Sequence, residues 1–457
     1  MPEKTAGSCT PELANLVHDT RWADVPPDMR HELKRCLLNY FAVALAGCTD
    51  PATRIAARTF GRFSAGRTAR LIGSGDRTDA LNAAALNALA ANVYDYDDTH
   101  IPTIIHPTAP VAAALLAHAD ATPLSGQRFM LALLLGIEVQ CRIGMAVSPF
   151  HYAHGWHITS TCGVFGSAMA VGKALELSPQ QLAWAVGAAA CQAGGLVEGL
   201  GTMAKSLSVG NAARNGMMAA LLAAEGFDGP EHPLEGRYGF ARVFGQDPDL
   251  DAIRDGLKGT WHLAKVAYKP YPCGIVLNPV LDASLALAGR LAPHELEHVV
   301  AIEITGHPLL RQRTDRPGVS SGRESQVSAQ HAVPMALLRR EAGFAAFSDT
   351  AVNDPVIRAM GKMLRFIDDE AYSVESARVR LHFNDGSAAE HTTPVARGSL
   401  QRPLNDQELE AKLRELCDYG QSGCDPEPLI EAIWNLEELE DVSTVSALAA
   451  GTGKPFW

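Results

Sequence analysis

Nearly every periodic stretch between residues 10 and 265 of this sequence has the spacing of an amphipathic helix. Within 30–46, apolar residues recur every three or four positions, at Leu33, Leu37, Tyr40, Phe41 and Leu45. Three further segments show the same spacing: 125–147, 178–190 and 211–225. No strands alternate with these helices, which excludes a parallel sheet with crossover helices. We therefore predict a large all-helical domain.

The pattern changes after the proline-rich segment Lys269-Pro270-Tyr271-Pro272. Residues 299–305 and 379–383 have the β-branched or alternating pattern of strands, and Asn384-Asp385-Gly386 predicts a hairpin turn. Helical spacing returns in three segments: 277–291, 330–341 and 406–448. We predict a mainly α protein in three parts: a helical domain over 1–268, an α+β unit over 269–395, and a helical tail over 396–457 that returns to the first domain.

Charge and composition exclude several classes of protein. Thirty-nine basic and 51 acidic residues give a net charge of −12, and no run of Lys and Arg suggests binding to nucleic acid. No uninterrupted apolar run reaches the roughly 18 residues of a membrane span. The first residues, Met1–Lys4, lack the apolar core of a signal peptide. Nine cysteines without a Cys-x-x-Cys pair favour a reduced, cytoplasmic protein.

Acidic and imidazole side chains gather in two short segments, 95–100 and 106–108. Three carboxylates, a threonine hydroxyl and two imidazoles can support acid–base catalysis when burial tunes one of their pKa values. The group includes Asp95, Thr99 and His106. A solvated loop that caps the next helix is the alternative interpretation.

Three histidines follow at His151, His154 and His157. Together with the acidic segment they suggest a zinc or iron site, and hence a metal-dependent hydrolase. The chain has no His-Glu-x-x-His motif, and Gly155 interrupts the spacing. A catalytic imidazole at the entrance of a helix is the simpler interpretation of His157.

Two lysines stand in unusual surroundings. From Gly199 to Ser206 the spacing is that of a phosphate-binding loop, except that Ala204 replaces the glycine before Lys205. No strand is predicted before it, so Lys205 is better interpreted as a point charge for an anionic ligand. Lys269 lies at the expected boundary between two domains, where ligands usually bind. A surface position is the alternative for each lysine.

These segments together resemble the MmgE/PrpD family, which includes 2-methylcitrate dehydratase, cis-aconitate decarboxylase and iminodisuccinate epimerase. The most specific match is Gly201-Thr202-Met203-Ala204-Lys205-Ser206, followed by the segment 210–216. The resemblance implies a large helical domain with a smaller α+β lid, a homodimer, and no metal or organic cofactor. It also implies an active site at the matching positions: Asp95, Thr99, His106, His157, Lys205 and Lys269.

Two departures count against cis-aconitate decarboxylation. The spacing from Asp95 to His106 is one residue longer than in the decarboxylases and is similar to the epimerase. A tyrosine of the decarboxylase lid aligns with His331. The expected activity is therefore a cofactor-independent lyase that abstracts a proton α to a carboxylate of a small di- or tricarboxylic acid, as 2-methylcitrate dehydratase does. An epimerase of an iminodisuccinate-like acid is the alternative, and a non-catalytic binding protein is a third possibility.

The resemblance also suggests roles. Lys205 and Lys269 neutralise substrate carboxylates, His157 and His106 exchange protons, and Asp95 orients or tunes one of the histidines. Thr99 and His331 bind the substrate, whereas the positions of three lid arginines relative to it stay open: Arg311, Arg313 and Arg323. If the lysines serve only a ligand, replacing either with Met lowers activity and leaves stability almost unchanged.

Overall fold

The computed structural model describes residues 8–257 and 259–452, so Met1–Lys4 lie outside the described residues. Two apolar cores organise them. The larger core takes its residues from both ends of the chain, from Cys9 to Tyr268 and from Leu404 to Ala449. The smaller core lies within residues 271–381. The mainly α fold with a smaller α+β domain is confirmed, and we propose that the domain boundaries lie near residues 269 and 396, as expected.

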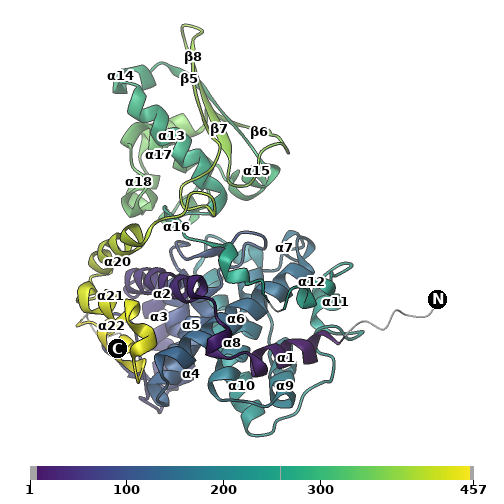
Figure 1. Ribbon diagram of the computed structural model, residues 1–457. Helices are drawn as coiled ribbons and strands as arrows, with labels where there is room; N and C mark the ends of the chain where they lie inside the picture. Colours follow the sequence, from purple (N-terminus) through teal and green to yellow (C-terminus); the bar gives the residue numbers. More distant parts are fainter. Residues whose placement is uncertain (1–7, 258, 453–457) are drawn as a thin grey trace, which may run out of the picture.

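The helical domain occupies the lower part of the molecule in Figure 1. Its helices are α1 (Cys9–Asp19), α2 (Pro27–Gly47), α3 (Pro51–Gly61), α4 (Ala80–Asn92), α5 (Thr108–Ala121), α6 (Gly126–Val147), α7 (Phe150–Ala153), α8 (Ile158–Ala174), α9 (Pro179–Ala190), α10 (Met203–Ala224), α11 (Phe240–Phe244) and α12 (Asp251–Arg254). The helices predicted over 125–147 and 178–190 are confirmed, and α9 begins with a capping box formed by Ser178 and Gln181. Helix α10 begins eight residues before the predicted start at residue 211.

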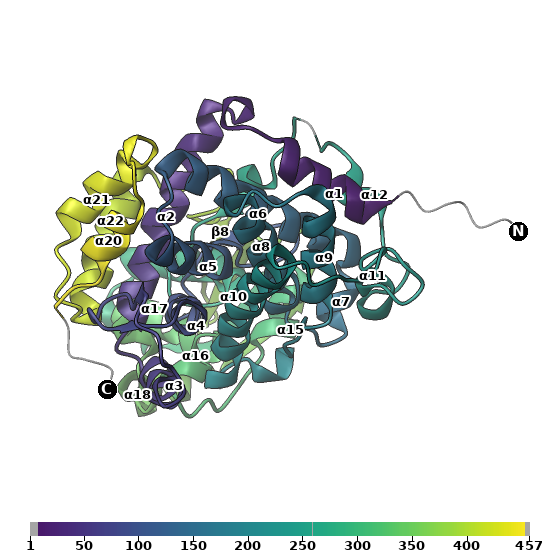
Figure 2. The ribbon, with the colours of Figure 1, turned by 90° about the horizontal axis from the view of Figure 1, so that it is seen from below.

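Small residues allow the central helices of this domain to approach closely. Helix α8 packs against α5, α6 and α10, and these helices lie together in the middle of Figure 2. A Cβ atom added to Gly216 of α10 would lie 2.4 Å from the carbonyl oxygen of Val164 in α8. Helix α6 is long and apolar enough to span a membrane, but 94% of its most apolar window is buried inside the protein. It is a core helix.

The α+β domain, here called the lid, lies above the helical domain in Figure 1. Its helices are α13 (Asn278–Arg290), α14 (Pro293–Leu296), α15 (Pro308–Thr314), α16 (Gly322–Ser325), α17 (Ala329–Arg339), α18 (Asp349–Val352) and α19 (Pro355–Gly361). The sheet has the order β6 (Leu364–Asp368), β5 (Val299–Gly306), β7 (Ala377–Phe383) and β8 (Ala388–Thr393). The strands predicted at 299–305 and 379–383 and the hairpin after β7 are confirmed. Strand β6 was not predicted and pairs in parallel with β5.

The tail forms α20 (Asp406–Gly420), α21 (Pro426–Trp434) and α22 (Ser443–Ala449). Helix α20 packs along α2, at the side of the helical domain in both views (Figures 1 and 2). This contact places α20 against the helical domain, and the assignment of the whole tail 396–457 to that domain stays a prediction. Helix α20 brings the buried Lys412 close to the segment that carries Asp95.

Candidate active site

A short pair of strands brings two distant loops together. Strand β3 (Thr99–His100) pairs with β4 (Val266–Ala267), with Thr99 opposite Ala267. The loop after α4 carries Asp95 on one side of this pair, and Lys269 follows on the other. The Nζ of Lys269 consequently lies 2.7 Å from the carbonyl oxygen of Asp95 and 3.2 Å from its Oδ2.

The entrances of two helices supply the next groups. His157 is the N-cap residue of α8, and its backbone NH donates to the carbonyl oxygen of Gly195. Lys205 lies in the first turn of α10, where the Thr202 hydroxyl caps the helix. Gly195 has a φ of 130°, and a Cβ atom there would lie 2.0 Å from the Ser160 Oγ, so the close approach requires glycine.

Five side chains predicted as catalytic line one cavity of about 60 Å³: Asp95, His106, His157, Lys205 and Lys269. The helical domain also contributes Ile104, Tyr152 and Leu200. The lid contributes Gly274, Ile275, Val276, Arg313, Thr314 and Val327. The cavity therefore lies between the two domains, with its charged groups mainly on the helical side and apolar side chains mainly from the lid.

Asp95 is the electrostatic centre of the cavity. Its carboxylate forms ion pairs with Lys205 and with Lys269. Burial alone would raise the pKa of Asp95, but the two ammonium groups outweigh it and hold that pKa well below its usual range. Burial likewise opposes the charge of Lys205, yet Asp95 raises the pKa of this lysine above its ordinary value. Asp95 and Lys205 are therefore charged at neutral pH.

The hydrogen bonds of His157 determine which of its ring nitrogens carries the proton. Nδ1 lies 3.2 Å from the Ser160 Oγ and 3.3 Å from the Ser208 Oγ. Both hydroxyl protons are used elsewhere, because Ser160 donates to the carbonyl of His157 and Ser208 to that of Lys205. Nδ1 must therefore be the donor, which leaves the Nε2 lone pair free.

His157 is neutral in these surroundings. Burial, and then the positive charge of Lys205, hold the pKa of His157 well below its ordinary value. Within residues 8–257 and 259–452, no hydrogen bond to its Nε2 is found. A neutral imidazole with an available lone pair on the cavity wall is suited to remove a proton from a ligand.

His106 has a different environment. Its Nδ1 lies 2.8 Å from the carbonyl oxygen of Asp98, which can only accept, so Nδ1 is protonated. Carboxylate oxygens of Asp97 and Asp95 lie 3.4 Å from Nδ1 and 3.6 Å from Nε2. Burial lowers the pKa of His106, while the Asp97 carboxylate opposes this shift. His106 therefore holds a proton more readily than His157.

Backbone strain marks the same loop. Asp95 has a φ of 52° and Ile104 a φ of 61°, in the left-handed region that non-glycine residues rarely adopt. Both residues line the cavity. Such strain persists where surrounding contacts impose it, and it concentrates at functional sites. Here the two lysines hold Asp95 in place.

The two residues predicted only as substrate-binding lie outside this cavity. Thr99 is fully buried behind His106, with its Oγ1 3.3 Å from Nδ1 of that histidine. His331 is buried in the lid, where its Nε2 donates to the carbonyl oxygen of Ala346 at 2.6 Å. Neither side chain borders the cavity, so a direct contact with substrate stays a prediction for both.

The three lid arginines lie in different surroundings, and their side chains have different partners. Arg311 pairs with Asp368 at the exposed surface of the lid. Arg323 pairs with Asp50 of the helical domain. Arg313 alone among these three lines the cavity.

The geometry does not support a metal site built on the three histidines. His151 is buried and uses both ring nitrogens, toward the Phe244 carbonyl and the Thr161 hydroxyl. His154 is exposed and stacks on Phe150. With Nδ1 of His157 directed to two serines, the three imidazoles share no common centre.

A second possible set of metal ligands consists of Asp95, Asp97 and His106, whose ligand atoms lie within 4.8 Å of one another. The two carboxylates face opposite nitrogens of the same imidazole ring. Two ammonium groups already contact Asp95. A divalent cation bound there would meet both positive charges, so this donor set does not suit one.

Three groups near the site were missed from the sequence: Tyr152, Ser208 and Lys412. Arg313 was named from the sequence, but its position was left open. Ser208 lies three residues after Lys205, on the same side of α10, and this spacing was the available signal. Lys412 stands beside the apolar stripe of Leu409, Leu413 and Leu416, an unusual place for a charge. No local pattern distinguished Tyr152 or Arg313.

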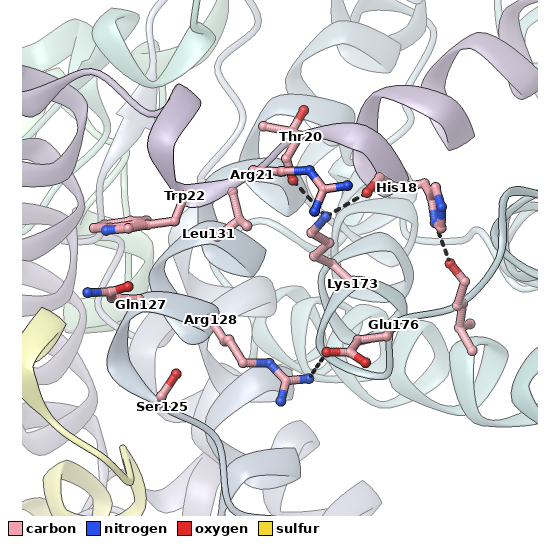
Figure 3. Close-up of a pocket in the computed structure, with 11 residues that line it drawn as sticks. His18, Thr20, Arg21, Trp22, Ser125, Gln127, Arg128, Leu131, Lys173 and Glu176 are labelled. Atoms are coloured by element: carbon pink, nitrogen blue, oxygen red, sulfur yellow. Dashed lines mark hydrogen bonds and ion pairs between the residues drawn. The ribbon is translucent and has the colours of Figure 1, made fainter.

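A larger pocket of about 420 Å³ lies elsewhere in the helical domain (Figure 3). Its polar groups bind to the backbone at the ends of helices. The ammonium of Lys173 donates to the carbonyl oxygens of His18 and Thr20, at 2.9 and 2.8 Å. Arg128 pairs with Glu176. These contacts stabilise the fold, so the size of a pocket does not by itself identify the active site.

Curated relatives match almost the whole chain. Human cis-aconitate decarboxylase is 27% identical over 98% of this chain and 96% of its own length. A cis-aconitate decarboxylase-like protein of Aspergillus oryzae is 27% identical over 97% of this chain and 98% of its own. Cis-aconitate decarboxylase of Aspergillus terreus is 26% identical over 96% of this chain and 95% of its own. These relatives support the expected enzyme class, a lyase.

The two family domains divide the chain between them. The MmgE/PrpD N-terminal domain matches residues 11–253, and the MmgE/PrpD C-terminal domain matches residues 271–438. The second match includes α20 and α21 of the tail. The matched regions meet at the segment that holds Lys269, where the cavity lies. The chain belongs to the MmgE/PrpD family.

Proposed function

We propose that this protein is a cofactor-independent lyase that removes the proton α to a carboxylate of a small di- or tricarboxylic acid. The reaction we favour is dehydration of a hydroxylated acid, of the 2-methylcitrate dehydratase type. One observation carries the proposal: a neutral imidazole, His157, lines the same small cavity as two ammonium groups that share one carboxylate. This arrangement places a base next to positive charge.

The lysines supply the electrostatic part of the reaction. A proton α to a carboxylate is weakly acidic because its removal places a second negative charge on the substrate. Lys205 and Lys269 would hold the carboxylate and stabilise the enediolate-like state in a site closed to water. Their contact with Asp95 fixes both ammonium groups before the substrate binds, so little reorganisation is needed.

The two histidines would divide the proton transfers. Nε2 of His157 takes the proton from Cα, and the electron pair left behind forms the double bond as the C–O bond breaks. The departing hydroxyl takes a proton from Nε2 of His106, which the bound anionic substrate keeps protonated, and leaves as water. This assignment follows from the surroundings, because carboxylates flank both nitrogens of His106, whereas Lys205 disfavours a charge on His157.

The test follows candidate acids by NMR in deuterated water. With 2-methylcitrate or citrate, the proposal expects an alkene to form with loss of water, and His157→Gln to abolish it. Deuterium at Cα with inversion and no alkene would establish the epimerase alternative. Binding without exchange or turnover would indicate a non-catalytic protein and contradict the proposal. Activity should also survive EDTA; loss that a divalent metal restores would favour the hydrolase.

Decarboxylation of cis-aconitate is a second candidate, supported by the relatives at 26–27% identity. This reaction needs a proton donor for the carbanion that remains after CO₂ leaves, and protonated His106 or Lys205 could serve. The neutral imidazole of His157 favours proton abstraction as the first step instead. The same NMR experiment with cis-aconitate, together with measurement of released CO₂, distinguishes the two reactions.

Assembly and location stay predictions. The family resemblance implies a homodimer, and the cysteines favour a cytoplasmic protein. The nine cysteines are all free thiols, eight of them buried. Light scattering of the purified protein tests the dimer.

A further inference from the structure

We propose that Arg313 determines substrate specificity by binding a second carboxylate, remote from the one held by Lys205 and Lys269. The inference rests on the proposed function and names the residue that recognises the second carboxylate of the acid. Arg313 lies near the end of α15, in the lid, and its side chain lines the same cavity as the two lysines. The groups on the two sides of the cavity belong to different domains.

The position of Arg313 is fixed by an aromatic ring. Its guanidinium carbon lies 3.6 Å from the centre of the Tyr152 ring, which belongs to α7 in the helical domain. Tyr152 also lines the cavity. Stacking on the ring restrains the plane of the guanidinium but uses none of its five NH donors. The donors stay available for a ligand.

Arg313 differs from Arg311 and Arg323 in that no carboxylate partner is found for it among the described residues. Arg311, on the same helix, pairs with Asp368, and Arg323 pairs with Asp50. Among the residues that the structure describes, no ion pair between Arg313 and a carboxylate is found. A half-buried guanidinium that faces a cavity without a counterion is suited to an anionic group of the ligand.

The charges on the cavity wall favour a dianion. Two ammonium groups and the Asp95 carboxylate leave one unbalanced positive charge on the helical side. His106 and His157 have lowered pKa values and add none at neutral pH. Arg313 supplies a second positive charge from the lid. A substrate with carboxylates at both ends neutralises the positive charge on both sides of the cavity, whereas a monocarboxylate leaves one positive charge unpaired.

A carboxylate on Arg313 would also join the two domains. The guanidinium can bind both oxygens in a planar, bidentate contact, which lysine cannot reproduce. A dicarboxylate that reaches Lys205 and Arg313 would hold α15 against the helical domain. Substrate recognition and lid closure would then depend on the same contact.

The test compares three saturated acids that cannot be dehydrated: tricarballylate, succinate and butyrate. Their dissociation constants are measured by calorimetry for the wild-type protein and for Arg313→Gln. We expect the wild type to bind the first two acids more tightly than butyrate. Arg313→Gln should weaken the binding of tricarballylate and succinate about tenfold to a hundredfold and leave the binding of butyrate unchanged. Arg313→Lys should restore only part of the loss.

The control is Arg311→Gln, which removes an arginine from the same helix but one that pairs with Asp368 at the surface. It should leave all three affinities unchanged. If the wild type binds the acids and Arg313→Gln binds them equally well, the role of Arg313 is wrong while the proposed function stands. If the wild type binds none of them and turns over no polycarboxylate, both proposals fail. Thermal unfolding of each variant verifies that it is folded.

Discussion

The Nζ of Lys412 donates a hydrogen bond to the carbonyl oxygen of Lys269 at 2.9 Å. The same ammonium group donates to the Tyr96 carbonyl and to the Asn39 side chain, at 2.9 and 2.8 Å. A lysine of the C-terminal tail thus ties helix α2 to both loops that meet at the cavity. A residue more than a hundred positions away in the sequence thus anchors the two segments that carry Asp95 and Lys269.

Lys412→Met should therefore reduce stability and activity together. Three buried acceptors lose their donor, at a cost of about 1–3 kcal/mol each if they stay unsatisfied. The loops that carry Asp95 and Lys269 then lose their common anchor, so kcat/KM should fall as well. Urea unfolding and steady-state kinetics on the cognate acid measure the two effects.

The matched control for this variant is Lys173→Met. Lys173 also donates to two backbone carbonyls, those of His18 and Thr20, but beside the pocket of Figure 3. It should lower stability and leave kcat/KM unchanged. Equal effects of the two variants on activity would contradict a specific role for Lys412.

The ion pairs of Asp95 change what we expect of the site lysines. From the sequence, replacing Lys205 or Lys269 with Met was expected to leave stability almost unchanged. The structure instead shows both ammonium groups bound to one buried carboxylate. Each variant should lower kcat/KM about tenfold to a hundredfold, and should also destabilise the protein by up to roughly 3 kcal/mol, because Asp95 loses a counterion.

A second substitution separates these two effects. Adding Asp95→Asn to Lys205→Met removes the carboxylate that lacks its partner. Stability should recover at least in part, whereas activity should not. Near-normal turnover of both single variants on the cognate acid would show that the active site is not here.

The fold could be predicted well because its signals are local. Helix spacing and the capping box of α9 lie within a few residues, and β5 and β7 have buried, β-branched or alternating patterns. Strand β6 lacks such a signal: no residue of 364–368 is fully buried, and only pairing with β5 makes it a strand. The early start of α10 was concealed by the glycines before Met203.

The site could be predicted only where residues carry their own chemistry. The family resemblance pointed to Asp95, His157 and Lys269, which the structure places at one cavity. It named Arg313 but could not place it at the site, because this arginine reaches the cavity only when two domains dock. The tautomer of His157 likewise depends on Ser208, which is 51 positions away.

The pH dependence of kcat/KM should reflect His157. A general base must be unprotonated, and burial with Lys205 holds the pKa of His157 well below the ordinary value of about 6.5. Protonation of the base should therefore cause no decline in activity as the pH falls through 6.5, and a decline only at lower pH. A decline centred at or above pH 6.5 would contradict His157 as the base.

The stability of the protein sets the lowest pH at which these kinetics can be measured. Burial lowers the pKa values of His151 and His262 to about 4. Between that value and about 6.5, the unfolded chain binds protons that the folded protein does not, so the free energy of unfolding falls as the pH decreases. Unfolding at each pH must therefore be measured alongside the kinetics.

Arg323 should control how firmly the lid docks. Its Nη2 lies 2.8 Å from Asp50 Oδ2, and its Nη1 donates to the Val93 carbonyl at 2.9 Å. These contacts join the lid helix α16 to the helical domain close to Asp95, without reaching the cavity. Arg323→Met breaks a largely buried ion pair, so the lid should open more often and the closed, binding-competent form should become less populated.

The expected result for Arg323→Met is a KM increase of about tenfold, equivalent to roughly 1.4 kcal/mol, with a smaller change in kcat. Arg323→Lys should not restore KM fully, because an ammonium cannot reproduce both the paired contact with Asp50 and the bond to Val93. Arg339→Met, which breaks an exposed ion pair with Asp354 inside the lid, is the control and should leave KM unchanged. If Arg323→Met lowers kcat and leaves KM unaltered, the pair with Asp50 acts on the chemical step instead of on closure.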